Sequence, residues 1–246
     1  MINKKVLSDI ISKYSLGGNV EKVKWNINDQ GGIAVRFIND SKNLVGSVIY
    51  NPDFGLKKGD YGIFNTSQLI KCLNILDGDI LVDTTKSNGL ASKLNIADTN
   101  YDIKFNLADP AVIPKTPDVN APEEPVAYFE VSDEFITRFV KSKDALSELD
   151  TFTIETRDGF NGEELVFTVG TNITNTIEFT VENATINESF EAVPFDSNLL
   201  KEILKANRTY HSGEIRINKK GLLDAHLHCG NDLYTGYYLV RRQENN

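Results

Sequence analysis

Apolar residues recur at helical spacing in four segments of the chain. When successive residues are placed 100° apart, each segment gathers its apolar side chains on one face and its charged side chains on the other. Ser132 is a candidate N-cap of the third segment, with Asp133 and Glu134 in its first turn. The pattern predicts four amphipathic helices, at residues 3–14, 66–76, 132–141 and 196–206.

Runs that alternate apolar and polar residues follow the first and the third of these segments. Such alternation is typical of strands that bury one face. Gly31-Gly32 and Asp158-Gly159 mark turns between runs. The predicted strands are VEKVKWNI, IAVRFI and LVGSVIY in the first half of the chain, and DTFTIETR, ELVFTVG and TIEFTVEN in the second.

Prolines are concentrated in the middle of the chain. Five of the seven lie within LADPAVIPKTPDVNAPEEP, residues 107–125. Proline removes backbone donors and favours an extended conformation, so this stretch predicts a semi-rigid linker. The expected organisation is a first domain at 1–107, a connector at 108–125 and a second domain at 126–246.

The two halves repeat the same order of elements. The two helices of the first half begin 63 residues apart, at positions 3 and 66, and those of the second half 64 apart, at 132 and 196. A shift of 133 residues also places Leu94 on Leu227 and Tyr101 on Tyr234. We therefore expect an α+β fold of two duplicated domains, each with antiparallel sheets and two helices.

Composition and charge limit the function. The 246 residues are 40% hydrophobic and 25% charged, which suits soluble domains with sizeable cores. The net charge of −9 taken alone argues against binding nucleic acid, because cations dominate contacts to phosphates. The positions of the cations on the molecule therefore decide whether nucleic acid is a plausible partner.

The chain also lacks the signals of export. No apolar run is long enough to span a bilayer, and no signal peptide is evident. Cys72 and Cys229 are too few for a disulfide framework in a chain of this length. We expect a cytoplasmic protein with no membrane partner.

Four segments together carry a resemblance to a known family. They are GIFNTSQLIKCLNILDGDILV, IADTNYDIKFNLADP, FDSNLLKEILKA and LYTGYYLVRR. With the duplicated architecture, they resemble the DNA polymerase sliding clamps, above all the phage clamps, which are small relatives of proliferating cell nuclear antigen. The long acidic connector and the basic pair Arg241-Arg242 depart from that family.

The resemblance implies a function. It implies a homotrimeric ring that encircles double-stranded DNA without sequence specificity and acts as a processivity factor in DNA replication. The partners implied are a replicative DNA polymerase, a clamp loader and two further copies of the chain, in the host cytoplasm if a phage encodes it. No enzyme activity, cofactor or metal is implied.

In such clamps the helices line the central hole, so their polar faces are expected to face DNA. Helical geometry places cations on or just beyond all four polar faces, with Asp9, Glu134 and Glu202 among them, so the hole would be weakly positive. A merely solvated lysine face is the alternative for any single helix. The expected DNA-facing residues are Lys4, Lys5, Lys13, Lys71, Arg138, Lys141, Lys201, Lys205 and Arg208.

The resemblance also implies a subunit interface and a partner pocket. Residues 101–107 of one subunit would pair with residues 175–181 of the next, although the same alternation fits an ordinary internal strand. An apolar pocket by the connector would bind partner peptides, with a core role as the alternative. The interface residues are Tyr101, Ile103, Phe105, Ile177 and Phe179, and the pocket residues are Leu107, Val112, Ile113, Tyr238, Leu239 and Val240.

An enzyme interpretation has one candidate cluster. Asp224, His226 and His228 alternate along one predicted strand and could offer three ligands to a divalent metal, but a solvated strand face needs no metal and is the preferred explanation. The chain has no phosphate-binding loop motif, no G-x-S-x-G and no CxxC pair. We expect no enzyme and no metal; a β-rich virion or surface structural protein is the alternative function, and a metal-dependent hydrolase a distant third.

Overall fold

The chain divides into two compact units in a computed structural model that describes residues 2–87, 89–119, 124–160, 162–171 and 173–243. Unit 1 is Met1–Pro117 with Gly230–Thr235, and unit 2 is Asp118–Cys229 with Gly236–Asn246. The predicted connector, 108–125, includes residues 120–123, which lie outside the described residues. The domain limits drawn from the sequence remain a prediction.

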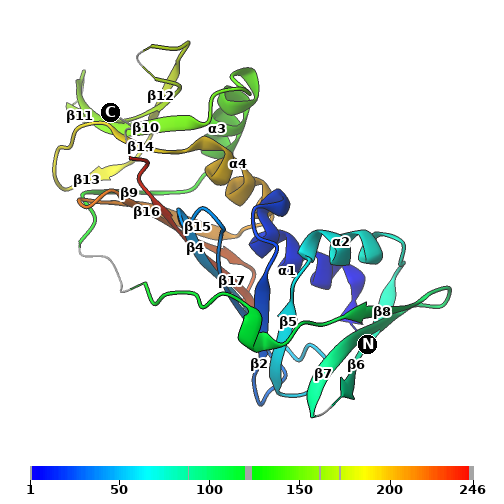
Figure 1. The fold of residues 1–246 in the computed structure, drawn as a ribbon. Helices are drawn as coiled ribbons and strands as arrows, with labels where there is room; N and C mark the ends of the chain where they lie inside the picture. The colour runs from blue at the N-terminus through cyan, green and yellow to red at the C-terminus, as the bar shows by residue number, and fades with distance from the viewer. Residues whose placement is uncertain (1, 88, 120–123, 161, 172, 244–246) are drawn as a thin grey trace. The chain divides into compact units, whose positions relative to one another are not determined.

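Unit 1 holds two helices and two antiparallel sheets (Figure 1). One sheet has the order β1-β6-β7-β8, and the other contains β4-β3-β2-β5. The elements are β1 (Ile2–Asn3), α1 (Lys4–Ser15), β2 (Val23–Ile27), β3 (Ile33–Ile38), β4 (Leu44–Tyr50), β5 (Gly59–Ile63), α2 (Thr66–Asn74), β6 (Asp79–Ser87), β7 (Leu90–Ala97) and β8 (Asp102–Asn106), with 3₁₀ turns η1 (Leu16–Gly18) and η2 (Pro110–Val112).

Unit 2 repeats this plan. One sheet has the order β12-β11-β10-β14, and another contains β13-β9-β15-β16-β17. Each unit thus has a helix after its first strand and a second helix before its last three strands, which confirms the predicted α+β duplication. The elements are β9 (Ala127–Glu130), α3 (Asp133–Ala145), β10 (Thr151–Gly159), β11 (Gly162–Val169), β12 (Ile177–Val181), β13 (Thr185–Ile186), β14 (Val193–Asp196), α4 (Ser197–Ala206), β15 (Ser212–Asn218), β16 (Leu222–Cys229) and β17 (Leu233–Val240).

Side chains cap all four helices at their N-termini. Ser132 caps α3 as predicted, since its hydroxyl accepts from Phe135 N at 3.1 Å. Asp196 caps α4 by accepting from Asn198 N and Leu199 N, both at 3.0 Å. Among the described residues no helix is long and apolar enough to cross a membrane.

The core of unit 1 lies between the paired helices α1 and α2 and the sheets (Figure 1). In β2, Val23, Trp25 and Ile27 are buried while the residues between them are exposed. The hydroxyl of Tyr14 lies 3.3 Å from Trp25 Nε1, and complete burial raises the pKa of Tyr14. The apolar positions that predicted the strand therefore face the core, and the polar positions between them face solvent.

Aromatic rings build the core of unit 2. Phe167 is central: its ring lies 5.2 Å from Phe135, 5.7 Å from Phe179 and 5.8 Å from Phe152, between centroids. Aromatic pairs at such distances contribute roughly 0.5–1.5 kcal/mol each beyond their area burial. The cluster joins α3 to β10, β11 and β12.

Candidate functional site

The helices are the cationic part of an acidic chain. Within the bounds of α1, α2, α3 and α4 there are nine lysines and arginines against five acidic residues. The whole chain has 26 against 35. Lys13 and Lys143 are buried with the apolar faces, and the other seven cations lie on the remaining faces, where they can meet an anionic partner.

In unit 1, Lys5 and Lys71 are exposed, and neither forms an ion pair within the described chain. Lys4 is half-buried and donates to the carbonyl of Leu76. Lys13 differs from expectation. Its side chain is fully buried and its ammonium lies 2.9 Å from the carboxylate of Asp9, so its expected exposure on the helix flank is wrong.

In unit 2, Arg138 and Lys141 of α3 are exposed, as is Lys205 of α4 with Arg208 just beyond. Acidic neighbours form ion pairs with some of these cations. Arg138 contacts Glu134 and lies 3.8 Å from Glu182. The face is therefore less positive than a count of lysines and arginines suggests.

Lys201 of α4 forms an ion pair with a residue of α3. Its ammonium bonds the carboxylate of Asp144, and this bond raises the pKa of Lys201 and lowers the pKa of Asp144. Asp144 lies in the last turn of α3, beyond the predicted end of that helix at residue 141. The sequence therefore gave no signal for this pair.

The predicted subunit strands both lie at sheet edges, since β8 ends its sheet in unit 1 and β12 ends its sheet in unit 2. Leu107 N donates to Ser92 O at 2.9 Å, so by alternation Phe105 and Ile103 bond β7, and Lys104 turns its backbone groups to the open side. Phe105 is core-facing, only 7% exposed, whereas Tyr101 is half exposed at 49%.

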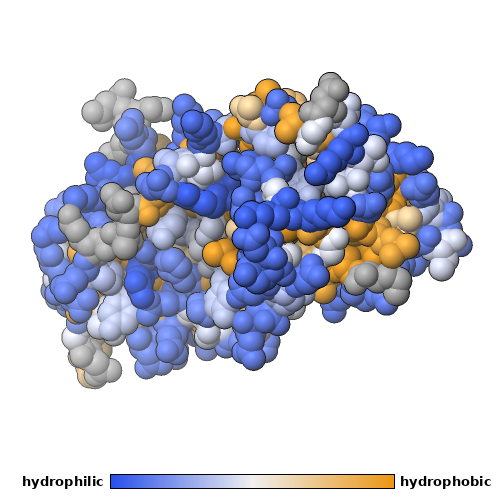
Figure 2. Space-filling model, turned by 90° about the horizontal axis from the view of Figure 1, so that it is seen from below, coloured by the Kyte–Doolittle hydropathy of each residue, from blue (hydrophilic) through white to orange (hydrophobic). Residues whose placement is uncertain are grey.

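Hydrophobic side chains gather near the β8 edge. Figure 2 shows an apolar patch on the side of unit 1 where β6, β7 and β8 lie. Leu81 and Leu90, from β6 and β7, are more than half exposed; Leu81 lies two strands from β8 and on the face opposite Ile103, which is half-buried. An exposed apolar surface beside an unpaired strand is typical of an association surface.

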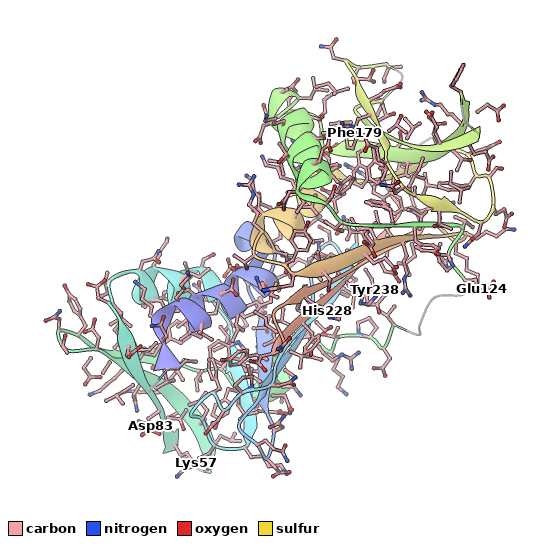
Figure 3. The ribbon with its side chains drawn as sticks, turned by 180° about the vertical axis from the view of Figure 1, so that it is seen from behind. Lys57, Asp83, Glu124, Phe179, His228 and Tyr238 are labelled. Atoms are coloured by element: carbon pink, nitrogen blue, oxygen red, sulfur yellow. The ribbon has the colours of Figure 1, made fainter. Side chains whose placement is uncertain are left out.

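A groove of mixed polar and apolar lining adjoins the β12 edge within unit 2. It has a volume of about 450 Å³ and lies against β9, α3 and β12, with Phe135 and Phe179 among its lining residues. Phe179 comes from β12 and lies beside α3 (Figure 3). Phe179 and Ile177 are half-buried, so part of each side chain remains accessible at the edge.

The first part of the connector crosses the face of β2, β3 and β5. It begins with an antiparallel bridge, in which Ala108 N donates to Gly62 O at 2.9 Å. A Cβ on Gly62 would lie 2.5 Å from the Ala108 carbonyl oxygen, so glycine permits this approach. At the other end, Arg36 Nη2 donates to Pro117 O at 2.9 Å.

The expected partner-pocket residues differ in exposure. Val112 is 60% exposed and Leu107 is half-buried, but Ile113 is buried. In the last strand, Val240 is 44% exposed, Tyr238 is half-buried and Leu239 is fully buried. The burial of Ile113 and Leu239 fits the core interpretation rather than a surface that a peptide could reach.

The expectation of a solvated Asp224-His226-His228 face is wrong for Asp224, which is 2% exposed. Its carboxylate oxygens have no hydrogen-bond partner within the described chain, and the nearer imidazole nitrogen, Nε2 of His226, is 3.8 Å away. His226 and His228 join His211 around a groove of about 520 Å³. Across the described ranges, no three His, Cys, Asp or Glu side chains are grouped so as to hold a metal ion.

Comparisons with known proteins were made by sequence and by fold. No family model and no curated protein matches the sequence. Among solved structures, proliferating cell nuclear antigen of A. fulgidus, described with the C-terminal region of FEN-1 bound, matches with a TM-score of 0.74 and 15% identity over 100% of this chain and 98% of that one. The chain has the fold of proliferating cell nuclear antigen.

A second solved structure agrees. Proliferating cellular nuclear antigen of Entamoeba histolytica matches with a TM-score of 0.70 and 18% identity, over 98% of this chain and 96% of that chain. At such identities the likeness establishes the fold and transfers no individual residue. It does not favour a virion or surface structural protein, and the phage origin stays a prediction.

Proposed function

We propose that this chain is the subunit of a sliding clamp, a ring that encircles duplex DNA and tethers a replicative polymerase without catalysing a reaction itself. The observation that carries the proposal is the full-length match of the duplicated fold to proliferating cell nuclear antigen. A fold alone does not fix a function, so the charges and edges of this chain must support it.

The helix faces support contact with DNA. Their surplus of cations in a chain of net charge −9 would attract phosphates, while the paired acidic residues keep each contact weak. Weak contacts to the backbone carry no sequence information and permit sliding. The proposed contacts are Lys4, Lys5, Lys71, Arg138, Lys141, Lys201, Lys205 and Arg208.

The sheet edges support a closed ring. A strand edge left open is a template for pairing, and β8 and β12 are two such edges with apolar side chains beside them. We propose that β8 of one copy pairs with β12 of the next and that three copies close the ring. Repeated head-to-tail contacts of this kind form closed rings when the rotation between copies allows it.

A closed ring would raise processivity through effective concentration. A polymerase bound to the ring stays near the template after each dissociation from DNA, and no new DNA contact is needed. The surface of the ring that binds the polymerase would also bind a clamp loader. The likeness of four segments to phage clamps supports a place of action in a host cytoplasm. We assign the binding of the polymerase and the clamp loader to the face of unit 1 that the connector crosses.

The mass in solution tests the ring. Light scattering over a range of concentrations is expected to give three times 27.5 kDa. The loaded protein should then stay on nicked circular DNA and slide off the same DNA once it is linearised. A strict monomer at every concentration, or equal loss from both DNA forms, would contradict the proposal.

A further inference from the structure

A groove of about 670 Å³ lies within unit 1, where β5 leads into α2 (Figure 1). We call it the α2 groove. Its lining brings together an aromatic ring, two side-chain amides, a hydroxyl, a carboxylate and an ammonium. The volume lies within the range of roughly 300–1,000 Å³ that ligand sites occupy. The lining residues are Glu21, Phe64, Asn65, Ser67, Gln68 and Lys71.

Phe64 provides an exposed aromatic ring in this groove. Its side chain is 50% exposed, although it lies between the buried residues Ile63 and Thr66. The ammonium of Lys22 lies over the ring, 5.2 Å from the centroid. This cation–π contact holds the ring in place. Because half of the side chain remains exposed, another flat group can still stack on it.

The N-terminus of α2 is not itself the ligand site, because its backbone N–H groups are already bonded. The carbonyl oxygen of Glu21 accepts from Thr66 N at 3.1 Å, and the Glu21 carboxylate accepts from Ser67 N at 2.9 Å and from the Ser67 hydroxyl. Asn65 Oδ1 accepts from Gln68 N at 2.8 Å. The one carboxylate among the lining residues is therefore occupied, and a ligand must bind the remaining side-chain groups.

Polar groups that can bind a ligand adjoin the ring. Gln68 and Lys71 are exposed and three positions apart on α2, so their side chains are neighbours. Within the described part of the chain, Lys71 forms no ion pair, and neither the Asn65 NH2 group nor the Gln68 side-chain amide forms a hydrogen bond. Amides pair with the edges of nucleobases, and an ammonium binds phosphate. The groove thus holds the three kinds of group that bind a nucleotide.

We propose that the α2 groove binds an unpaired nucleotide of single-stranded DNA, with its base stacked on Phe64 and its phosphate near Lys71. Duplex DNA is a poorer occupant, because its bases are stacked on one another and must first be extruded. An apolar peptide side chain could cover Phe64 but would leave the amides and Lys71 without partners. The role of this contact in replication rests on the proposed function, whereas the chemistry of the ligand rests on the groove.

Fluorescence anisotropy of a labelled thymidine dodecamer tests the stacking. Phe64→Leu keeps an apolar side chain but removes the aromatic face, so it should weaken binding at least fivefold, the lower end of the effect of losing one stacked base. Phe64→Tyr should bind like the wild type. A dodecamer of abasic sugar-phosphate units should bind the wild type and Phe64→Leu equally, since it has no base to stack. Equal affinity of Phe64→Leu and the wild type for the thymidine dodecamer, or no binding by the wild type, would overturn the proposal.

Salt dependence separates stacking from attraction to phosphate. Lys71→Gln removes a phosphate contact, so it should weaken the binding of single-stranded and duplex DNA and reduce the salt dependence of both. Phe64→Leu should weaken only the binding of single-stranded DNA and leave its salt dependence unchanged. If Phe64→Leu weakens the binding of duplex DNA to the same degree, the ring does not recognise an unpaired base and the proposal fails.

Two control variants change unit 1 outside the groove. Ile75 is 51% exposed just beyond the end of α2, and Ile75→Ala should leave the affinity for the thymidine dodecamer unchanged. Lys57→Gln removes a charge at another exposed site and should weaken binding less than Lys71→Gln does (Figure 3). If Ile75→Ala weakens binding as much as Phe64→Leu, or Lys57→Gln as much as Lys71→Gln, the effects are not specific to the groove and the proposal fails.

Failure of this inference is distinguishable from failure of the clamp. Mass by light scattering and retention on circular DNA are measured for the wild type and for Phe64→Leu. If the ring forms and is retained but Phe64→Leu binds the thymidine dodecamer like the wild type, only the groove assignment falls. If the loss of affinity in Phe64→Leu is found in a protein that never forms a ring, the clamp falls and the groove stands.

Discussion

Asp224 is a buried carboxylate with no hydrogen bond to offset its lost hydration. It is paired across the strands with Arg216, whose guanidinium bonds Glu214, and His226 Nε2 is 3.8 Å away. Leaving a charged acceptor buried and unpaired costs more free energy than a neutral one in the same place. Attraction to the nearby Arg216 offsets part of this cost, so we expect the burial of Asp224 to lower the stability of unit 2 only modestly.

We expect Asp224→Asn to raise the free energy of unfolding at pH 7 by about 1 kcal/mol, because it removes a buried charge while keeping the shape. For a domain of 150–250 residues, 1 kcal/mol corresponds to a rise in melting temperature of roughly 2–4 °C. Thermal unfolding followed by circular dichroism measures it. Asp40→Asn, at an exposed position, should change nothing, and a destabilised Asp224→Asn protein would contradict the prediction.

Asp150 and Arg242 provide a pH-dependent contact in unit 2. Arg242 donates to the carboxylate and to the carbonyl of Asp150, and this bond holds the pKa of Asp150 below its usual value. A carboxyl whose folded pKa is depressed stabilises the fold above its unfolded pKa, about 3.9, and that stability is lost as the pH falls through the folded pKa. The contribution is therefore complete at pH 7 and declines as the pH falls below about 3.9.

Arg242→Gln should accordingly lower the free energy of unfolding by about 0.5 kcal/mol at pH 7, a figure kept small because the Asp150 side chain is 57% exposed. The difference from wild type should be smaller at pH 2. Urea unfolding at both pH values measures it, and Arg208→Gln, another exposed arginine, should match the wild type throughout. An equal loss at both pH values would mean that Arg242 acts by packing.

At the scale of elements, the sequence predicted the helices and strands that a local pattern of residues determines. It missed the elements that depend on pairing with distant residues. The four helices and the Ser132 cap follow from apolar spacing and a capping residue. By contrast, α3 continues to Ala145 because Ser142 and Lys143 extend its buried face, and Lys143 satisfies its ammonium by donating to Ser147 O at 2.7 Å. No hydropathy pattern marks a buried lysine.

The short strands were missed for a related reason. β5 has glycine at two of its five positions, so it has neither clear alternation nor strong strand propensity. It is a strand because β2 pairs with it over its whole length, from Gly59 to Ile63. Such pairing joins residues more than thirty positions apart, which a local reading of the sequence does not detect.

The β8 edge gives a prediction at this scale. Lys104 turns its backbone N–H to the open side, so Lys104→Pro removes a donor from the proposed subunit contact and spares the bonds from β8 to β7. We expect the trimer to dissociate at protein concentrations at least tenfold higher than for the wild type. Light scattering during dilution measures this.

Lys104→Ala is the matched control, because it removes the side chain and keeps the N–H; it should assemble like the wild type. Circular dichroism should show both variants folded. If Lys104→Pro folds and assembles normally, β8 does not form the subunit contact through its backbone.

At the scale of the whole molecule, net charge alone argues against the proposed partner, DNA. A chain of −9 suggests avoidance of nucleic acid, yet its helices carry a surplus of cations. Helical geometry located that surplus, but it could not show that Lys13 is buried against Asp9 or that Asp144 engages Lys201. Lys13 and Asp9 lie four residues apart on α1, but the burial of Lys13 depends on how the helix packs, and the Asp144–Lys201 pair joins α3 to α4.

Reversing the helix charges tests the DNA contact itself. Glutamate at Lys5, Lys71, Arg138, Lys141 and Lys205 should abolish stimulation of a cognate polymerase while the mass of the ring is unchanged, because these side chains are exposed and contribute little to the cores. Lys13 is left intact because its burial would confound folding with binding.

The wild-type protein, but not the variant, should bind short duplex DNA weakly, with an affinity that falls as salt rises, since cation contacts to phosphates release counterions. Titration of labelled duplex at several salt concentrations measures both quantities. The control reverses Lys57 and Lys93, which are exposed and outside the helices, and should keep both stimulation and salt dependence. If the control loses stimulation and DNA binding equally, the effect is due to net charge. If the helix variant stimulates the polymerase fully, the helix faces do not contact DNA.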